Sequence, residues 1–106
     1  MTRRTLPQRR PAETFDLLFR NQSVTVTIGF YPNGNVGETF VDVAKSGNDL
    51  AHIARDAAIV LSIALQCGAS VETLRHALTR GSHGEPASIM GAIVDALPVL
   101  PRERQS

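Results

Sequence analysis

The chain has 106 residues, a near-neutral net charge of +1 and a single cysteine, Cys67. This length predicts one domain with a modest core, and one thiol excludes an internal disulfide, a dithiol redox pair and a cysteine-rich zinc site. The first thirteen residues are basic and interrupted by proline, unlike a signal peptide, and the longest apolar stretch (57–64) is far too short to span a membrane. We therefore expect a soluble, cytoplasmic protein that makes no membrane contact.

Charge is distributed unevenly along the chain. Residues 14–97 hold five basic and eight acidic side chains, whereas the segment before them holds four arginines and one glutamate. We expect a disordered basic arm at 1–13, a single domain at 14–97 and a flexible tail at 98–106. The arm could bind nucleic acid or an acidic partner, and the alternative is a solubilising terminus. The candidate nucleic-acid contacts are Arg3, Arg4, Arg9 and Arg10.

The first half of the domain predicts three β-strands in an antiparallel meander. FDLLFR (15–20) and SVTVTIGFY (23–31) alternate apolar and polar residues, which is typical of strands with one buried face. In the second strand, Val24, Val26, Ile28 and Phe30 are expected to face the core, and Thr25, Thr27 and Tyr31 the other side. Asn33-Gly34 is a strong turn signal, and GETFVDVA (37–44) follows as the third strand.

The second half changes to helical spacing at residues 45–49 and predicts three helices. Gly68 suits a left-handed cap that ends the first helix, and Ser70 can cap the second. Pro86 suits the first turn of the third helix. The apolar stripe expected to face inward on the first helix comprises Leu50, Ile53, Ala54, Ala57, Leu61, Ala64 and Leu65. The order βββααα predicts an α+β fold with the helices packed on one face of the sheet.

The connection before the first helix is a candidate phosphate site. Unpaired N–H groups at a helix start attract anions, and a lysine lies close by. A nucleotide could therefore bind at Lys45, Ser46, Gly47 and Asn48. The alternative is an ordinary strand-to-helix connection, because no GxxxxGK[ST] motif is present.

No group of residues meets the requirements for catalysis. His52 and Asp56 have a metal-compatible i, i+4 spacing but lack an apparent third ligand, and a helix end separates His76 from His83. Cys67 lies near a helix C-terminus, where the helix dipole opposes thiolate formation. We expect no catalytic residue, metal or cofactor, so an independent enzyme is the least favoured interpretation.

The uncovered face of the sheet is a candidate interface. It would combine a half-apolar surface with open strand edges, which favours self-association or docking onto a larger protein. The alternative is a threonine-rich face in contact with water. The candidate interface residues are Leu18, Thr25, Thr27, Tyr31 and Phe40.

Four segments, taken in order, resemble the TSCPD domain family over about residues 14–97. They are SVTVTIGFYPNGNVGETFVD, AKSGNDL, RDAAIVLSIALQCGASVETLRHAL and EPASIMGAIVDAL. This family occurs at the C-terminal end of adenosylcobalamin-dependent ribonucleotide reductases and as small stand-alone proteins. The T-S-C-P-D signature itself is missing, and its nearest counterpart, Pro86-Ala87-Ser88, has no cysteine.

The resemblance implies a small α+β module linked to deoxyribonucleotide metabolism. It does not imply reductase activity, because such a reductase needs a large barrel and several cysteines. Our main hypothesis is a non-catalytic accessory module that associates with itself or with a larger protein such as a ribonucleotide reductase. The alternatives are a small nucleic-acid-binding protein that uses the basic arm, and a nucleotide-binding regulatory module at residues 45–48.

Overall fold

The computed structural model describes residues 2–44 and 48–98. Three antiparallel strands, β1 (Ala12–Phe19), β2 (Gln22–Phe30) and β3 (Val36–Val43), form a sheet in the order β1-β2-β3. Three helices follow, α1 (Asn48–Gln66), α2 (Val71–Ala77) and α3 (Ile89–Ala96). The predicted βββααα order and α+β class are confirmed. Strand β1 begins two residues before the expected domain boundary at residue 14.

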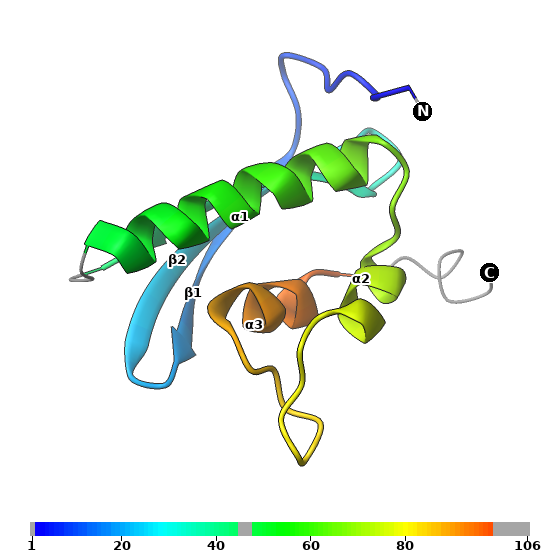
Figure 1. Cartoon of the computed structure of the whole chain (residues 1–106). Helices are drawn as coiled ribbons and strands as arrows, with labels where there is room; N and C mark the ends of the chain where they lie inside the picture. Colours follow the sequence, from blue (N-terminus) through cyan, green and yellow to red (C-terminus); the bar gives the residue numbers. More distant parts are fainter. Residues whose placement is uncertain (1, 45–47, 99–106) are drawn as a thin grey trace.

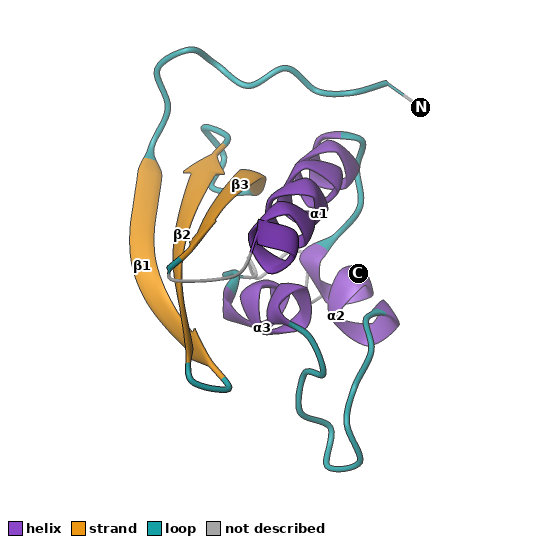
Figure 2. Ribbon diagram, turned by 60° about the vertical axis from the view of Figure 1, so that its left-hand side comes forward, coloured by secondary structure: helices purple, strands orange, loops and turns teal. Residues whose placement is uncertain are grey.

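The helices form one layer against one face of the sheet (Figure 1, Figure 2). The alternation of β2 fixes that face, because Val24, Val26 and Ile28 are completely buried. From β1, Phe15 and Leu17 pack against the same core. From α3, Ile93 and Val94 close it. None of the helices in the described ranges combines the length and the apolar character of a membrane span.

The ends of the helices follow mostly from local sequence. Gly68 has a φ of +106°, the left-handed conformation predicted for the residue that ends α1. Ser70 caps α2 by accepting a hydrogen bond from the Thr73 N–H, as predicted. The prediction for α3 was wrong by a few residues. Ser88 accepts a hydrogen bond from the Gly91 N–H and starts the helix, so Pro86 lies outside it in an isolated bridge with Arg80.

Helix α1 lies along the free edge of β3 and covers part of it with polar side chains. The Ser62 Oγ accepts a hydrogen bond from the Thr39 N–H (2.9 Å) and also lies 3.2 Å from the Thr39 carbonyl oxygen. One turn later, the Gln66 side-chain amide donates to the Gly37 carbonyl oxygen (2.9 Å). These bonds fix the helix relative to the strand, because they satisfy backbone groups that β2 cannot reach.

Candidate functional site

The outer face of the sheet is more polar than predicted. Leu18 and Phe40 are exposed, as expected for interface residues. Thr25 and Thr27 are half-buried, and their hydroxyl groups are hydrogen-bonded to Asp16 and Thr14 on β1. The structure brings four of the five predicted interface residues to one face, with threonine and carboxylate groups between the two apolar side chains.

Tyr31 is buried beneath the N-terminal arm, and its assignment to the interface was wrong. Its side chain is only 3% exposed, and its hydroxyl group donates a hydrogen bond to the Arg4 carbonyl oxygen (2.9 Å). The physical reason is the N-terminal arm: the Arg4 guanidinium group stacks on the Tyr31 ring, 3.9 Å from its centroid. Alternation within β2 (Gln22–Phe30) gives no information on such a cover, because the arm comes from a distant part of the sequence.

Among the described residues, several exposed aliphatic side chains gather on α1, where we had not predicted them. We call this surface the outer face of α1, and it consists of Ile53, Ile59, Val60 and Ile63. Ile53 and Val60 are both 66% exposed, although Ile53 was expected to point into the core. The sequence contained a signal for this surface. Every residue from 57 to 65 except Ser62 is apolar, and one side of a helix cannot bury all of them.

An apolar groove continues this surface at the start of α1. It has a volume of about 360 Å³ and lies between α1, α3 and the β1–β2 hairpin. The guanidinium group of Arg20 stacks over the ring of Phe19, 4.9 Å from its centroid, beside the groove. The apolar residues that line it are Phe19, Leu50, Ile53, Ala54, Ala57, Ile89 and Met90. An exposed aliphatic surface with an adjoining apolar groove is a typical docking site for another protein.

The basic arm lies against the domain, whereas we had expected it to be disordered. The Arg4 N–H donates to the Gln66 carbonyl oxygen (2.7 Å) at the end of α1, and the Arg4 guanidinium group stacks on the Tyr31 ring at 3.9 Å. Gly37 allows this close approach, because a Cβ atom there would lie 2.7 Å from both Leu6 and Tyr31. Sequence inspection missed the docked arm because its partners are far away in the chain.

Three of the four predicted arm arginines are brought together by internal contacts. The Arg3 Nε donates to the Gln66 side-chain oxygen. Arg10 forms a salt bridge with Glu38, while Arg9 remains exposed. Around these groups the arm encloses a polar hollow of about 400 Å³, which we call the arginine hollow. Its lining includes Arg3, Arg4, Arg10, Glu38 and Gln66.

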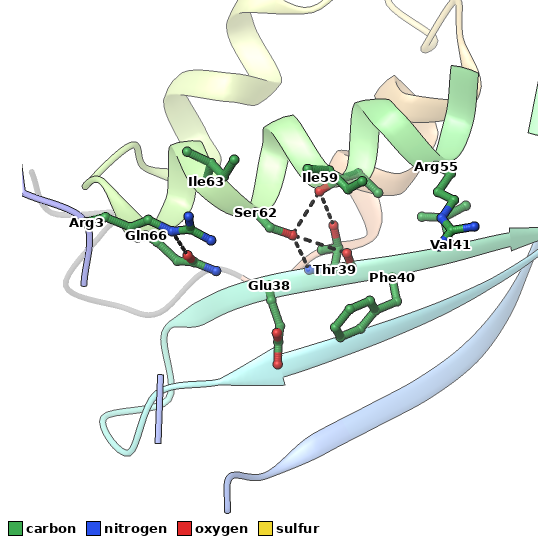
Figure 3. A pocket seen from close by; sticks show the side chains of 11 residues that line it. Arg3, Glu38, Thr39, Phe40, Val41, Arg55, Ile59, Ser62, Ile63 and Gln66 are labelled. Atoms are coloured by element: carbon green, nitrogen blue, oxygen red, sulfur yellow. Dashed lines mark hydrogen bonds between the residues drawn. The ribbon is translucent and has the colours of Figure 1, made fainter. Parts of the chain in front are cut away.

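A second hollow, of about 480 Å³, adjoins the arginine hollow and is lined by residues of β3 and α1 (Figure 3). We call it the edge hollow. It shares Arg3, Glu38 and Gln66 with the arginine hollow and extends to Phe40 and Arg55. In Figure 3, the side chains of Glu38 and Phe40 point away from α1. Together the two hollows extend from the arginines of the arm to Phe40 and Arg55.

The remaining predicted sites stay apart or cannot be placed. Lys45, Ser46 and Gly47 lie outside the described residues, and so does the side chain of Asn48. His52 and His83 are exposed, while the His76 ring nitrogen lies 3.3 Å from the Glu72 carboxylate. In the described part of the chain, no three histidine, cysteine or acidic side chains gather where a metal could bind.

One ion pair has a clear electrostatic signature. Arg80 contacts both carboxylate oxygens of Asp95 at 2.6 Å. The hydrogen bonds from Arg80, together with the positive charges of Arg80 and Arg75, lower the pKa of Asp95, and burial opposes the shift. The same hydrogen bond raises the pKa of Arg80. This pair connects the loop after α2 to α3, and it lies outside both hollows.

Comparison with known proteins places the chain in a family. The model of the TSCPD domain matches residues 2–99, which includes the arm as well as the sheet and helices. The chain belongs to the TSCPD domain family. No solved structure matches it.

The curated relatives of this TSCPD domain are much longer proteins. A vitamin B12-dependent ribonucleotide reductase of Rhodopirellula baltica is 32% identical over 72 residues, which cover 68% of this chain and 7% of the reductase. The reductase of that name in Streptomyces clavuligerus is 32% identical over 67% of the chain and 7% of its own length. The reductase of that name in Streptantibioticus cattleyicolor is 32% identical over 67% of this chain and 12% of its own length. The chain thus matches only a small segment of each of these relatives.

Proposed function

We propose that this TSCPD domain is a non-catalytic accessory module that acts by protein association in deoxyribonucleotide metabolism. Its partner is a vitamin B12-dependent ribonucleotide reductase. The choice of partner is supported by the relatives, in which the matching segment is 7–12% of a reductase chain. A module that is covalently part of a reductase in one protein is suited to bind such a reductase in another.

The observation that carries this proposal is the outer face of α1. Ile53 and Val60 are each two-thirds exposed to water, and the apolar groove lies beside them. Covering apolar surface stabilises a complex by about 25 cal/mol for each Å² removed from water. Arg20 and Gln22 at the groove provide polar groups of the kind that surround the apolar centre of an interface.

Polar substitution on the outer face of α1 tests the docking surface. The double variant Ile53→Lys, Val60→Lys should weaken binding to the vitamin B12-dependent reductase of the same organism at least ~10-fold, because charges replace apolar contacts there. Titration calorimetry with the purified proteins measures this change. Both side chains are exposed, so the thermal unfolding of the double variant should stay close to that of the parent.

Leu18→Lys is the matched control, because Leu18 is also an exposed aliphatic residue but lies on the sheet. Its binding should remain within about twofold of the parent, since a single surface change away from an interface has little effect. If Leu18→Lys abolishes binding while the α1 variant does not, the docking surface is the outer face of the sheet. Absence of binding at ~100 µM would contradict the proposed partner. Sedimentation of the chain alone shows whether a second copy occupies the same surface.

A further inference from the structure

The arginine hollow concentrates positive charge at one end of the domain. Three arginine side chains line it, and the carboxylate of Glu38 carries the opposing charge. That carboxylate is paired with Arg10, so two guanidinium charges remain without a neutralising partner in the hollow. A concave site with an excess of one sign of charge raises the local concentration of ions of the opposite sign. The hollow therefore suits an anion with several negative charges.

The three guanidinium groups are held in place while donors remain available. Arg3 bonds Gln66 through Nε, Arg10 bonds Glu38 and the Pro7 carbonyl oxygen, and the Tyr31 ring supports Arg4 from one face. A guanidinium group has five N–H donors. Within the described residues, no acceptor is bonded to the Arg4 guanidinium group or to the two terminal nitrogens of Arg3. Fixed donors of this kind match phosphate oxygens and lose little conformational entropy on binding.

The edge hollow adds an aromatic surface next to this cationic end. Phe40 is 57% exposed, whereas Phe15, Phe19 and Phe30 are packed against the core. Phe40 lies two residues from Glu38 on β3, and both side chains point to the same side of the strand (Figure 3). The two hollows, of about 400 and 480 Å³, are in the size range of small-molecule sites.

We propose that the arginine hollow and Phe40 form a binding site for a nucleoside triphosphate. Arg3, Arg4 and Arg10 hold the phosphates, and the base stacks on the Phe40 ring. A nucleotide fits better than a bare anion because an exposed aromatic ring adjoins the phosphate donors. It fits better than a nucleic-acid strand because strands are bound on several stacking platforms, and the described surface offers one. The edge hollow shares Ile59 and Ile63 with the outer face of α1, so this site borders the proposed docking surface, whereas Arg3, Arg4, Arg10 and Phe40 lie outside that surface.

The test is a titration of the full chain with ATP, followed by amide chemical shifts and by calorimetry. We expect the largest shifts at residues 3–10 and 38–41. Removing two phosphate donors in the double variant Arg3→Ala, Arg4→Ala should weaken ATP binding at least ~10-fold. The control is Arg9→Ala, which removes one positive charge from the same arm at an exposed position outside the hollow. Its affinity should remain within about twofold.

Two further probes separate the phosphate end from the base end. Phe40→Leu should weaken ATP binding several-fold and leave the binding of tripolyphosphate unchanged, because tripolyphosphate has no base to stack. Phe40 is exposed, so this variant tests the site even if the arginine variant perturbs the arm.

The proposal would be overturned if ATP did not bind at about 5 mM or if the amide shifts were confined to residues 45–49. It would also be overturned if Arg9→Ala weakened ATP binding as much as the double variant does, or if Phe40→Leu weakened the binding of ATP and of tripolyphosphate equally.

Discussion

Large aliphatic side chains lie on both sides of α1 but in opposite environments. Val60 is 66% exposed, and its neighbour Leu61 is 6% exposed and part of the core. The inner side packs on β3, whereas the outer side has no element of the described chain against it (Figure 1). Hydrophobicity alone therefore does not identify a core residue. The position of the sheet decides which side of the helix is buried, and the other side becomes a candidate contact surface.

The largest expected effect in this comparison is on stability. Leu61→Ala should lower the free energy of unfolding by about 2–4 kcal/mol, because it leaves a cavity between α1 and the sheet. Val60→Ala, one residue away, should change it by less than about 0.5 kcal/mol. Urea unfolding monitored by circular dichroism measures both values. Equal losses in the two variants would mean that both sides of α1 are covered in solution.

A smaller effect is expected at the border between the two sides. Ser62→Ala should destabilise the domain by about 1–2 kcal/mol, because the Thr39 N–H loses the acceptor that covers it at the β3 edge. Hydrogen exchange of the Thr39 amide should accelerate at the same time. Ser82→Ala, at an exposed loop position, is the control and should change neither quantity. Unchanged protection of Thr39 would show that the Ser62 hydroxyl does not fix α1 to the strand.

The smallest expected effect concerns the ion pair between Arg80 and Asp95, outside α1, and its contribution to the stability of the fold. Because the pKa of Asp95 is lower in the folded protein, the stabilisation from its pairing is fully present above the ordinary aspartate pKa of about 3.9. It is lost as the pH falls through the lowered folded value. Asp95→Asn should therefore reduce stability slightly at pH 6 and flatten its fall below pH 4. Unfolding curves from pH 6 to 2 test this, and identical slopes for the two proteins would exclude the contribution.

Local sequence predicted those features of the fold that depend on neighbouring residues. The alternation in β2 placed Val24, Val26 and Ile28 correctly, since every second side chain of a paired strand faces the helices. Gly68 and Ser70 act within one helical turn, so their roles were also predictable. The match of the family to residues 2–99 agrees with the resemblance that the sequence motifs suggested.

The candidate sites were less predictable because they depend on contacts between distant residues. Tyr31 is covered by the N-terminal arm, and the docking of the arm has no strong local signal in the sequence. The sequence pointed to the arginines of the arm as candidate binding residues. Their gathering in one hollow depends on contacts with Gln66 and Tyr31, which only the fold brings near them. Phe40 was correctly expected on the surface, while its position beside the arginine hollow required the structure.

The bonds from Ser62 and Gln66 to β3 leave the sheet with two unequal edges. At β3, the Thr39 N–H and the Gly37 carbonyl oxygen are hydrogen-bonded to side chains of α1. At the other edge, no described strand lies beyond β1 (Figure 2). Fibrils and strand-swapped dimers grow by adding strands to an open edge. Intermolecular β-pairing of this protein should therefore begin at β1, where the exposed carboxylates of Glu13 and Asp16 oppose a second copy. Protection against aggregation is thus provided by helix side chains at one edge and by charge at the other.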